Sequence, residues 1–233
     1  MFGLTWVVSA LLHKNPPYHP IRDATAISGI SSIPNALVVA PSVPAKSVQE
    51  FIELAKSRPG QLNFASVGVG SSSHIAAEIF VHAAGIKVVH VPFKTLSGVF
   101  SEMASNQIHF YVFTVPSTLA VLGERKFRAL AVTSKKRSAA LPDVPTFSEV
   151  GLPAAEFDNW SGLIAPAKMP LKLVKKINAD VRRILQDPSM ASSLAARGAV
   201  PSEYVTSESF SDLLKSEYAR YKKLIPEIGI EPS

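Results

Sequence analysis

Short apolar runs alternate with amphipathic segments along most of this sequence. Apolar runs bounded by turn residues are typical of strands, whereas apolar positions spaced three and four apart are typical of helices. The predicted strands are residues 27–32, 36–40, 62–66, 87–91, 108–113 and 128–133, and residues 156–165 form an extended stretch. The predicted helices are residues 47–58, 74–84, 96–104, 116–122, 146–150, 170–185, 188–198 and 208–224. Strands that alternate with helices between Leu37 and Thr133 indicate parallel α/β units.

Capping residues mark several of these helices. Ser47 and Glu50 have the spacing of a capping box, and Pro59 with Gly60 ends the helix that follows. Asp187 precedes Pro188, which is a favoured first residue of a helix. These signals make the helix boundaries more specific than periodicity alone.

The first twelve residues are apolar. The run Phe2–Leu12 has no basic residue before it and no small-residue cleavage site after it, so it does not fit a secretory signal peptide. We interpret the run as a buried strand. A chain that opens inside a strand is expected to have lost a preceding segment.

Composition and charge limit the classes of protein. The 233 residues are 47% hydrophobic and 18% charged, and 24 Lys and Arg against 18 Asp and Glu give a net charge of +6. The basic residues form no stripe with interleaved aromatic residues, so a nucleic-acid partner is not expected. No apolar run reaches the ~20 residues of a membrane span. The chain has no cysteine, which excludes disulfides, thiolate metal sites and a cysteine nucleophile.

The strongest local signal is a loop of glycine and serine between the predicted strand 62–66 and the helix from residue 74. A helix N-terminus presents unpaired N–H groups and a partial positive charge. Gly68 and Gly70 let the backbone approach a ligand, while Ser66, Ser71 and Ser72 add hydroxyl donors. Such a loop can hold a carboxylate or phosphate without a charged side chain.

Two readings of this loop remain open from the local sequence. It is either an anion site or an ordinary turn in which Ser71 or Ser72 caps the helix. His74 is either a ligand donor or a structural histidine. The loop lacks the third glycine of a dinucleotide fingerprint, the Gly-Lys pair of a phosphate loop and the central serine of a nucleophile elbow.

No other cluster in the sequence carries chemistry. The remaining histidines have no metal-ligand spacing, and no pair of carboxylates stands out as an acid and base. We therefore expect no enzymatic activity, no metal and no cofactor.

Motifs along nearly the whole chain resemble the solute-binding receptors of tripartite tricarboxylate transporters, also called Bug-type receptors. The residues that carry the resemblance are Pro17–Asp23, Leu37–Pro41, Pro44–Ser47, Ala55–Lys56, Pro59–Gly60, Ala65–Ser71 with His74, His90–Lys94, Arg128–Thr133, Arg137, Leu141–Thr146, Glu149–Pro153 and Trp160–Pro166. Each motif is weak, but the set in this order is specific.

The resemblance implies an α/β fold of the type II periplasmic-binding-protein kind, with two lobes, parallel or mixed sheets and a ligand cleft that closes. Residues 1–40 and 128–233 would form the first lobe, and residues 41–127 the second. The ligand would be bound by the glycine-serine loop and His74 from the second lobe, and by Thr5, Trp6 and Asp158 from the first. The implied partners are a small carboxylate and the membrane subunits of the transporter, the implied location is the periplasm, and the protein is expected to be a monomer.

The sequence departs from the family pattern in two ways. Phe93 and Thr95 stand where the family usually has tyrosine and glycine. The family's opening segment, with its signal peptide and first strands, is not present, so we expect an incomplete first lobe and low stability.

Two other functions remain open at this point. The same fold serves as the ligand-sensing domain of transcription regulators, and a shortened chain could be a remnant without function. The identity of the carboxylate does not follow from neutral loop donors.

Overall fold

The computed structural model describes residues 2–125 and 127–230, and the chain divides into two compact units. Unit 1 comprises residues up to Ile33 together with the chain from Asn159 onward. Unit 2 comprises Pro34–Asp158. Each unit is an α/β structure with its own sheet, in agreement with the expected fold class.

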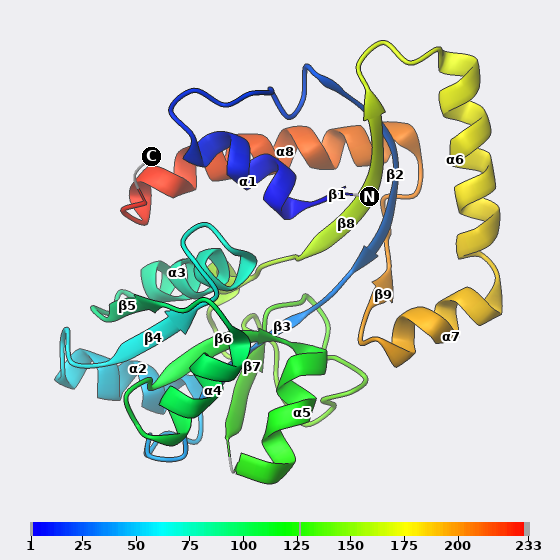
Figure 1. Ribbon diagram of the computed structural model, residues 1–233. Coiled ribbons are helices and arrows are strands. Elements are labelled where there is room, and N and C mark those ends of the chain that lie inside the picture. The colour runs from blue at the N-terminus through cyan, green and yellow to red at the C-terminus, as the bar shows by residue number, and fades with distance from the viewer. Residues whose placement is uncertain (1, 126, 231–233) are drawn as a thin grey trace. The chain divides into compact units, whose positions relative to one another are not determined.

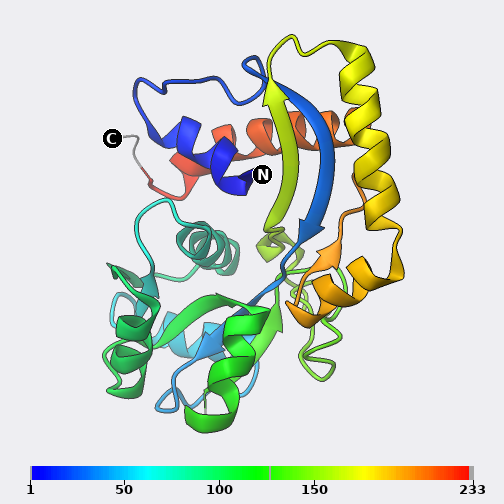
Figure 2. The ribbon, with the colours of Figure 1, turned by 45° about the vertical axis from the view of Figure 1, so that its right-hand side comes forward.

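Unit 1 is built around an antiparallel sheet. Its strands are β1 (Phe2–Gly3), β2 (Ala24–Ser32), β8 (Trp160–Pro166) and β9 (Val200–Pro201), in the order β1-β8-β2-β9. Its helices are α1 (Leu4–Leu12), α6 (Leu171–Leu185), α7 (Pro188–Ala196) and α8 (Ser207–Glu227). Helices α1 and α8 pack together on one side of the β2–β8 pair, and α6 lies against β2 on the other (Figures 1 and 2).

The N-terminal segment corrects one expectation. The run Phe2–Leu12, expected as a strand, contributes only two residues to β1, and the rest is helix α1. The buried residues Leu4, Val7 and Val8 have the spacing of one helix face, and this face meets α8. An unbroken apolar run shows no periodicity, so only the packing partner decides between helix and strand.

Unit 2 is built around a mixed sheet in the order β5-β4-β6-β3-β7. The strands are β3 (Asn35–Val39), β4 (Asn63–Ser66), β5 (Val89–Pro92), β6 (Phe110–Thr114) and β7 (Arg128–Val132). The helices are α2 (Val48–Ser57), α3 (Ser72–Ala84), α4 (Leu96–Ala104), α5 (Val115–Arg125) and the 3₁₀ turn η1 (Pro153–Ala155).

The sheet of unit 2 is not wholly parallel. Strand β4 runs parallel to β5 and β6, but β3 is antiparallel to both β6 and β7. The helices between β4 and β7 allow parallel crossovers, whereas β3 follows β2 after a two-residue break and enters the sheet in the opposite direction.

Aromatic side chains fill the core of unit 2. Phe51 from α2, Phe80 from α3 and Phe110 from β6 form one cluster, with ring centroids 5.0–6.0 Å apart. Phe113, which points to the opposite side of β6 from Phe110, packs on Phe100 of α4 at 5.0 Å. Helices therefore cover both faces of the sheet, one through Phe110 and the other through Phe113, as is usual where strands run parallel.

Two further expectations change. The unit boundaries lie at 33/34 and 158/159 instead of 40/41 and 127/128, because β3 and β7 are hydrogen-bonded neighbours in the sheet of unit 2. Residues 146–150 form a turn and no helix. Thr146 and Glu149 exchange capping hydrogen bonds of 2.7 and 3.1 Å there, but Gly151 at φ 78° ends the turn at once.

Within the described residues, no helix is long and apolar enough to cross a membrane.

Candidate functional site

The glycine-serine loop joins the carboxyl end of β4 to the N-terminus of α3 (Figure 1). Ser71 caps the helix, since its hydroxyl accepts the His74 N–H at 3.3 Å. Gly68 has φ 121° and Gly70 has φ 77°, both in the region that favours glycine. The structure thus places these candidate residues in sequence along the site: Ser66 ends β4, Gly68, Gly70 and Ser71 form the loop, and Ser72 and His74 lie in the first turn of α3.

Side chains of the loop bind several of its own N–H groups. The Val67 N–H donates to Ser73 Oγ at 3.3 Å, and the Gly68 N–H donates to Ser66 Oγ at 3.1 Å. The Gly70 N–H donates to His74 Nδ1 at 3.1 Å. The Ser71 N–H donates to the Gly68 carbonyl at 3.2 Å. These four donors are therefore unavailable to a ligand without rearrangement.

Three N–H groups of the loop have no acceptor in the described part of the chain: those of Val69, Ser72 and Ser73. They lie at the start of α3, where the helix dipole adds a partial positive charge. The Val69 side chain is 67% exposed. Unsatisfied N–H groups at an accessible helix N-terminus can bind an anion.

His74 is a buried structural member of this loop, with 3% exposure. Its Nδ1 accepts the Gly70 N–H, so the neutral ring carries its proton on Nε2, which lies 3.5 Å from the Glu78 carboxylate. The two ring nitrogens thus already have protein partners. Direct contact between His74 and a ligand stays a prediction.

His90, on the edge strand β5, is a further member that the sequence did not single out. Its Nε2 lies 2.7 Å from Ser66 Oγ, and its ring stacks on His74 with centroids 4.0 Å apart. Burial, and then the neighbouring His74, lower the pKa of His90 to about 4. Both effects keep the ring neutral near pH 7.

The distance between Ser66 and His90 would suit a nucleophile and its base, but the surroundings of the two side chains do not suit catalysis. The Ser66 side chain is fully buried, with 0% exposure, and its hydroxyl is also bonded to Gly68. A ring whose pKa is about 4 is a weak base for removing a serine proton. The pair is therefore suited to holding the loop.

The sheet topology also points to this edge of unit 2. Strand β4 leads through α3 to β5 on one side, whereas β6 leads through α5 to β7 on the other. In open α/β sheets, ligands bind where the connections of adjacent strands diverge in this way. The hydroxyls of Thr114, the last residue of β6, and Ser117, in the first turn of α5, are bonded at 3.0 Å; they lie at the same end of the sheet and extend the candidate site.

The other predicted ligand residues lie elsewhere in the fold. Thr5 and Trp6 belong to unit 1, in the first turn of α1 instead of at the end of a strand. The Trp6 ring stacks on Tyr18 at 3.8 Å and donates to the Pro20 carbonyl at 3.1 Å. Asp158 is the last residue of unit 2. Their part in ligand binding stays a prediction.

The structure assigns a local hydrogen bond to each of the two residues, Phe93 and Thr95, that depart from the family pattern. Thr95 caps α4, and its hydroxyl accepts the Gly98 N–H at 3.3 Å with φ −139°, so no glycine is needed there. The Phe93 N–H donates to the Ser66 carbonyl at 2.8 Å. Phe93 therefore extends the pairing of β5 to the strand that carries the loop.

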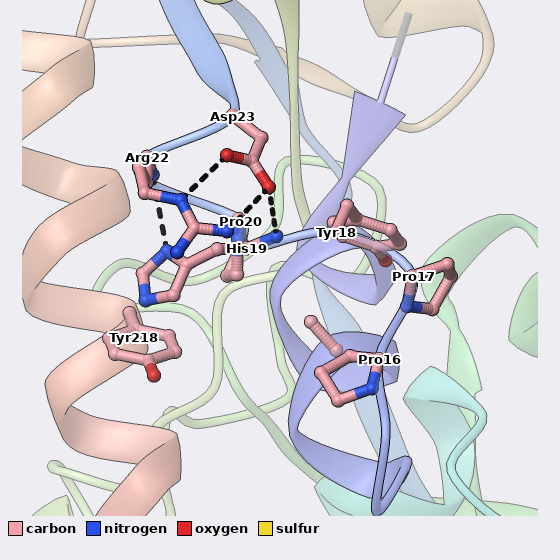
Figure 3. Close-up of a pocket in the computed structure, with 9 residues that line it drawn as sticks. Pro16, Pro17, Tyr18, His19, Pro20, Arg22, Asp23 and Tyr218 are labelled. Atoms are coloured by element: carbon pink, nitrogen blue, oxygen red, sulfur yellow. Dashed lines mark hydrogen bonds and ion pairs between the residues drawn. The ribbon is translucent and has the colours of Figure 1, made fainter.

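Unit 1 contains a pocket of about 270 Å³ next to the turn at residues 19–23 (Figure 3). Its lining residues are Ala10, Pro16, Pro17, Tyr18, His19, Pro20, Arg22, Asp23 and Tyr218. The Arg22 guanidinium is already paired with Asp23 at 2.8 Å, and this pairing lowers the pKa of Asp23 to about 2. Because the two charges cancel, the pocket is a weaker anion site than the loop.

Among the described residues, no group of three or more His, Cys, Asp or Glu side chains is arranged to hold a metal ion.

Comparison with known proteins places the chain in a family. The family model described as "Tripartite tricarboxylate transporter family receptor" (TctC) matches residues 3–230. The chain belongs to the TctC receptor family. The resemblance inferred from the motifs is thereby confirmed.

A curated TctC-like relative is the "UPF0065 protein in tcbD-tcbE intergenic region" of Pseudomonas sp. (strain P51). It is 31% identical over 222 residues, which cover 95% of this chain and 66% of the relative. The chain spans about two thirds of the length of the curated relatives it matches.

Two solved structures share the fold. "R. palustris Rpa4515 with adipate" is 29% identical with a TM-score of 0.83, covering 98% of this chain and 76% of that one. "MatC (Rpa3494) from Rhodopseudomonas palustris with bound malate" is 26% identical with a TM-score of 0.79, covering 96% and 77%. Both of these TctC-like neighbours bind dicarboxylates.

Proposed function

We propose that this chain is the solute-binding part of an extracytoplasmic receptor, and that the loop Ser66–His74 holds one carboxylate of a small organic acid. The observation that carries the proposal is a set of three N–H groups at the N-terminus of α3, those of Val69, Ser72 and Ser73, for which residues 2–125 and 127–230 provide no acceptor. The loop's other N–H donors are already bonded, so these three form a defined set.

The charges around the loop support an anionic ligand bound by dipoles. His90 is neutral near pH 7, so its side chain neither repels nor attracts an acid by full charge. Backbone N–H groups then provide the attraction, and hydrogen bonds to a charged acceptor contribute about 1.5–3 kcal/mol each.

The neighbours support the ligand class. One is titled with adipate and the other with malate, and both are dicarboxylates. A second carboxylate would be held outside the loop, where Thr114, Ser117 and the predicted residues Thr5, Trp6 and Asp158 are candidates.

Binding without bond chemistry fits the site better than catalysis. The Ser66 hydroxyl is fully buried and bonded to His90 and Gly68, so it is not placed to attack a substrate in this conformation. We further infer, from the family, that the receptor acts in the periplasm as a monomer, closes on its ligand and delivers it to the membrane subunits of a tripartite transporter.

The test is a thermal-shift and calorimetric screen of the 233-residue chain against adipate and malate, with adipamide as the uncharged control. Ligand at 100 times Kd is expected to stabilise the native state by about 2.7 kcal/mol. For a chain of this size that is a Tm increase of roughly 5–11 °C. If the folded chain is stabilised by no acid, or equally by adipamide, the carboxylate site is wrong.

A further inference from the structure

His90 lies outside the loop but is bonded to its first residue. The Ser66 hydroxyl is shared among three groups: His90 Nε2 at 2.7 Å, the Gly68 N–H at 3.1 Å and the Gly68 carbonyl at 3.0 Å. A hydroxyl has one proton and two lone pairs, so its orientation depends on all three neighbours. Gly68 has φ 121°, and its carbonyl also accepts from the Ser71 hydroxyl at 2.7 Å and the Ser71 N–H at 3.2 Å.

We call the Ser66 hydrogen bonds to Gly68 the first clamp on the loop. A second clamp, made by His74, acts on Gly70, two residues further on. The His74 ring accepts the Gly70 N–H and stacks on His90 with centroids 4.0 Å apart, while the Phe64 centroid lies 6.3 Å from it. His90 also stacks on Phe64 at 4.8 Å. The edge strand β5, the strand β4 and the helix α3 are thus joined through three stacked rings directly behind the loop.

The clamps decide which N–H groups remain free. Ser66 and His74 take up the N–H groups of Gly68 and Gly70, on either side of Val69. If Ser66 turned away, the Gly68 N–H would lose its acceptor, and Gly68 would be held only through its carbonyl, which accepts from the Ser71 N–H and hydroxyl. The N–H of Val69 would then lose its position relative to those of Ser72 and Ser73 at the helix terminus.

The surroundings of His90 suit a neutral ring that forms a hydrogen bond with Ser66. The ionisable side chains that face it come from α3: His74 in ring contact, and Glu78 through His74. The residues of β4 paired with β5, from Asn63 to Ser66, carry no charge. A neutral ring can share the Ser66 hydroxyl without adding a repulsive charge beside His74.

We propose that His90 is a positioning residue for ligand binding. It acts through Ser66, without contact with the ligand, and holds the loop in the conformation that leaves the N–H groups of Val69, Ser72 and Ser73 free. This proposal rests on the proposed function for its effect on affinity, but its effect on the loop can be measured without any ligand.

Three single variants separate the possible roles. His90→Phe keeps the stacked ring and removes the hydrogen bond. His90→Gln can place an amide nitrogen or oxygen near the position of Nε2 and restores the bond without the aromatic ring. His109→Phe is the matched control, because His109 Nδ1 accepts the Asn63 N–H at 2.9 Å at the opposite end of β4.

Amide hydrogen exchange by NMR gives the readout for the loop. We expect His90→Phe to increase the exchange rates of Gly68 and Gly70 by at least tenfold, and His90→Gln to restore most of the protection. His109→Phe should increase exchange at Asn63 and leave Gly68 and Gly70 unchanged. Loop protection in His90→Phe equal to the wild type, or equal loss in the Phe and Gln variants, would overturn the proposal.

Calorimetric titration with adipate gives the second readout. If the wild type binds, His90→Phe should weaken the affinity about tenfold or more, while His90→Gln stays closer to the wild type. Unchanged affinity in His90→Phe overturns the proposal. If adipate and malate bind to no form of the chain, the proposed function fails, and the exchange rates alone decide whether His90 positions the loop.

Discussion

Replacing Ser72 by proline removes one of the three free N–H groups and little else. Ser72 is the first residue of α3, where proline is favoured because its missing N–H has no helical partner. The preceding residue, Ser71, has φ −65° and ψ 159°, the extended conformation that a residue before proline requires. The Ser72 hydroxyl has no partner in the described part of the chain. The fold should therefore accept the substitution.

The size of the effect follows from the lost hydrogen bond. An N–H donated to a carboxylate contributes about 1.5–3 kcal/mol, so Ser72→Pro should weaken carboxylate binding roughly 10- to 150-fold. Ser72→Ala is the matched control, since it loses the same hydroxyl but keeps the N–H. Its affinity should remain much closer to that of the wild type.

Isothermal titration with adipate measures the affinities, and urea denaturation measures the stability of each form. Proline at a compatible position changes stability by about 0.4–1 kcal/mol in favour of the folded state. Equal affinities of the alanine and proline variants would refute the role of the backbone N–H. Equal and large losses in both would instead assign the contact to the hydroxyl.

Three other predictions concern the loop, the core of unit 1 and pH. Gly68→Ala places a side chain at φ 121°, which costs about 1–3 kcal/mol and should lower adipate affinity about 5- to 150-fold if the loop changes conformation. Gly85→Ala, at φ 60° beyond the other end of α3, should reduce Tm without this loss. Gly162→Ala places a Cβ against the Phe210 ring, where there is no room for it, and should destabilise the chain by about 1–3 kcal/mol in urea denaturation. Adding Phe210→Leu makes room for the new side chain, so the double variant should lose less stability than the two single variants lose together. A loss equal to that sum would contradict the packing argument. Because the folded pKa of His90 is depressed to about 4, its neutral ring stabilises the fold fully above pH 6.5, and this contribution is lost as pH falls to about 4. After discounting for partial burial, we expect the free energy of unfolding to fall by about 1–2 kcal/mol between these limits. Denaturation at pH 7.0, 5.5 and 4.5 measures this fall, and His90→Phe should abolish it.

Local signals in the sequence determined most elements of unit 2 and the long helices of unit 1. The capping residue Ser47 precedes α2 as expected, and α4 begins and ends at the predicted residues. The strand–loop–helix around Gly68 and Gly70 was also predicted, because glycines and a capping serine act on the backbone of their own segment.

Elements without a local signal needed the tertiary structure. Phe2–Leu12 became α1 because its buried face meets α8, and β3 runs antiparallel because of where it enters the sheet. Neither the packing partner of an apolar run nor the direction of a strand is contained in its own residues.

The same limit applies to the site. The sequence indicated which residues form the loop, but not which of its N–H groups are free. That depends on Ser66, Ser73 and His74 turning back onto the loop, and on His90 arriving from a strand 24 residues later to meet Ser66. A hydrogen bond between distant segments exists only after the sheet has brought them together, so the donors left for a ligand are a property of the fold.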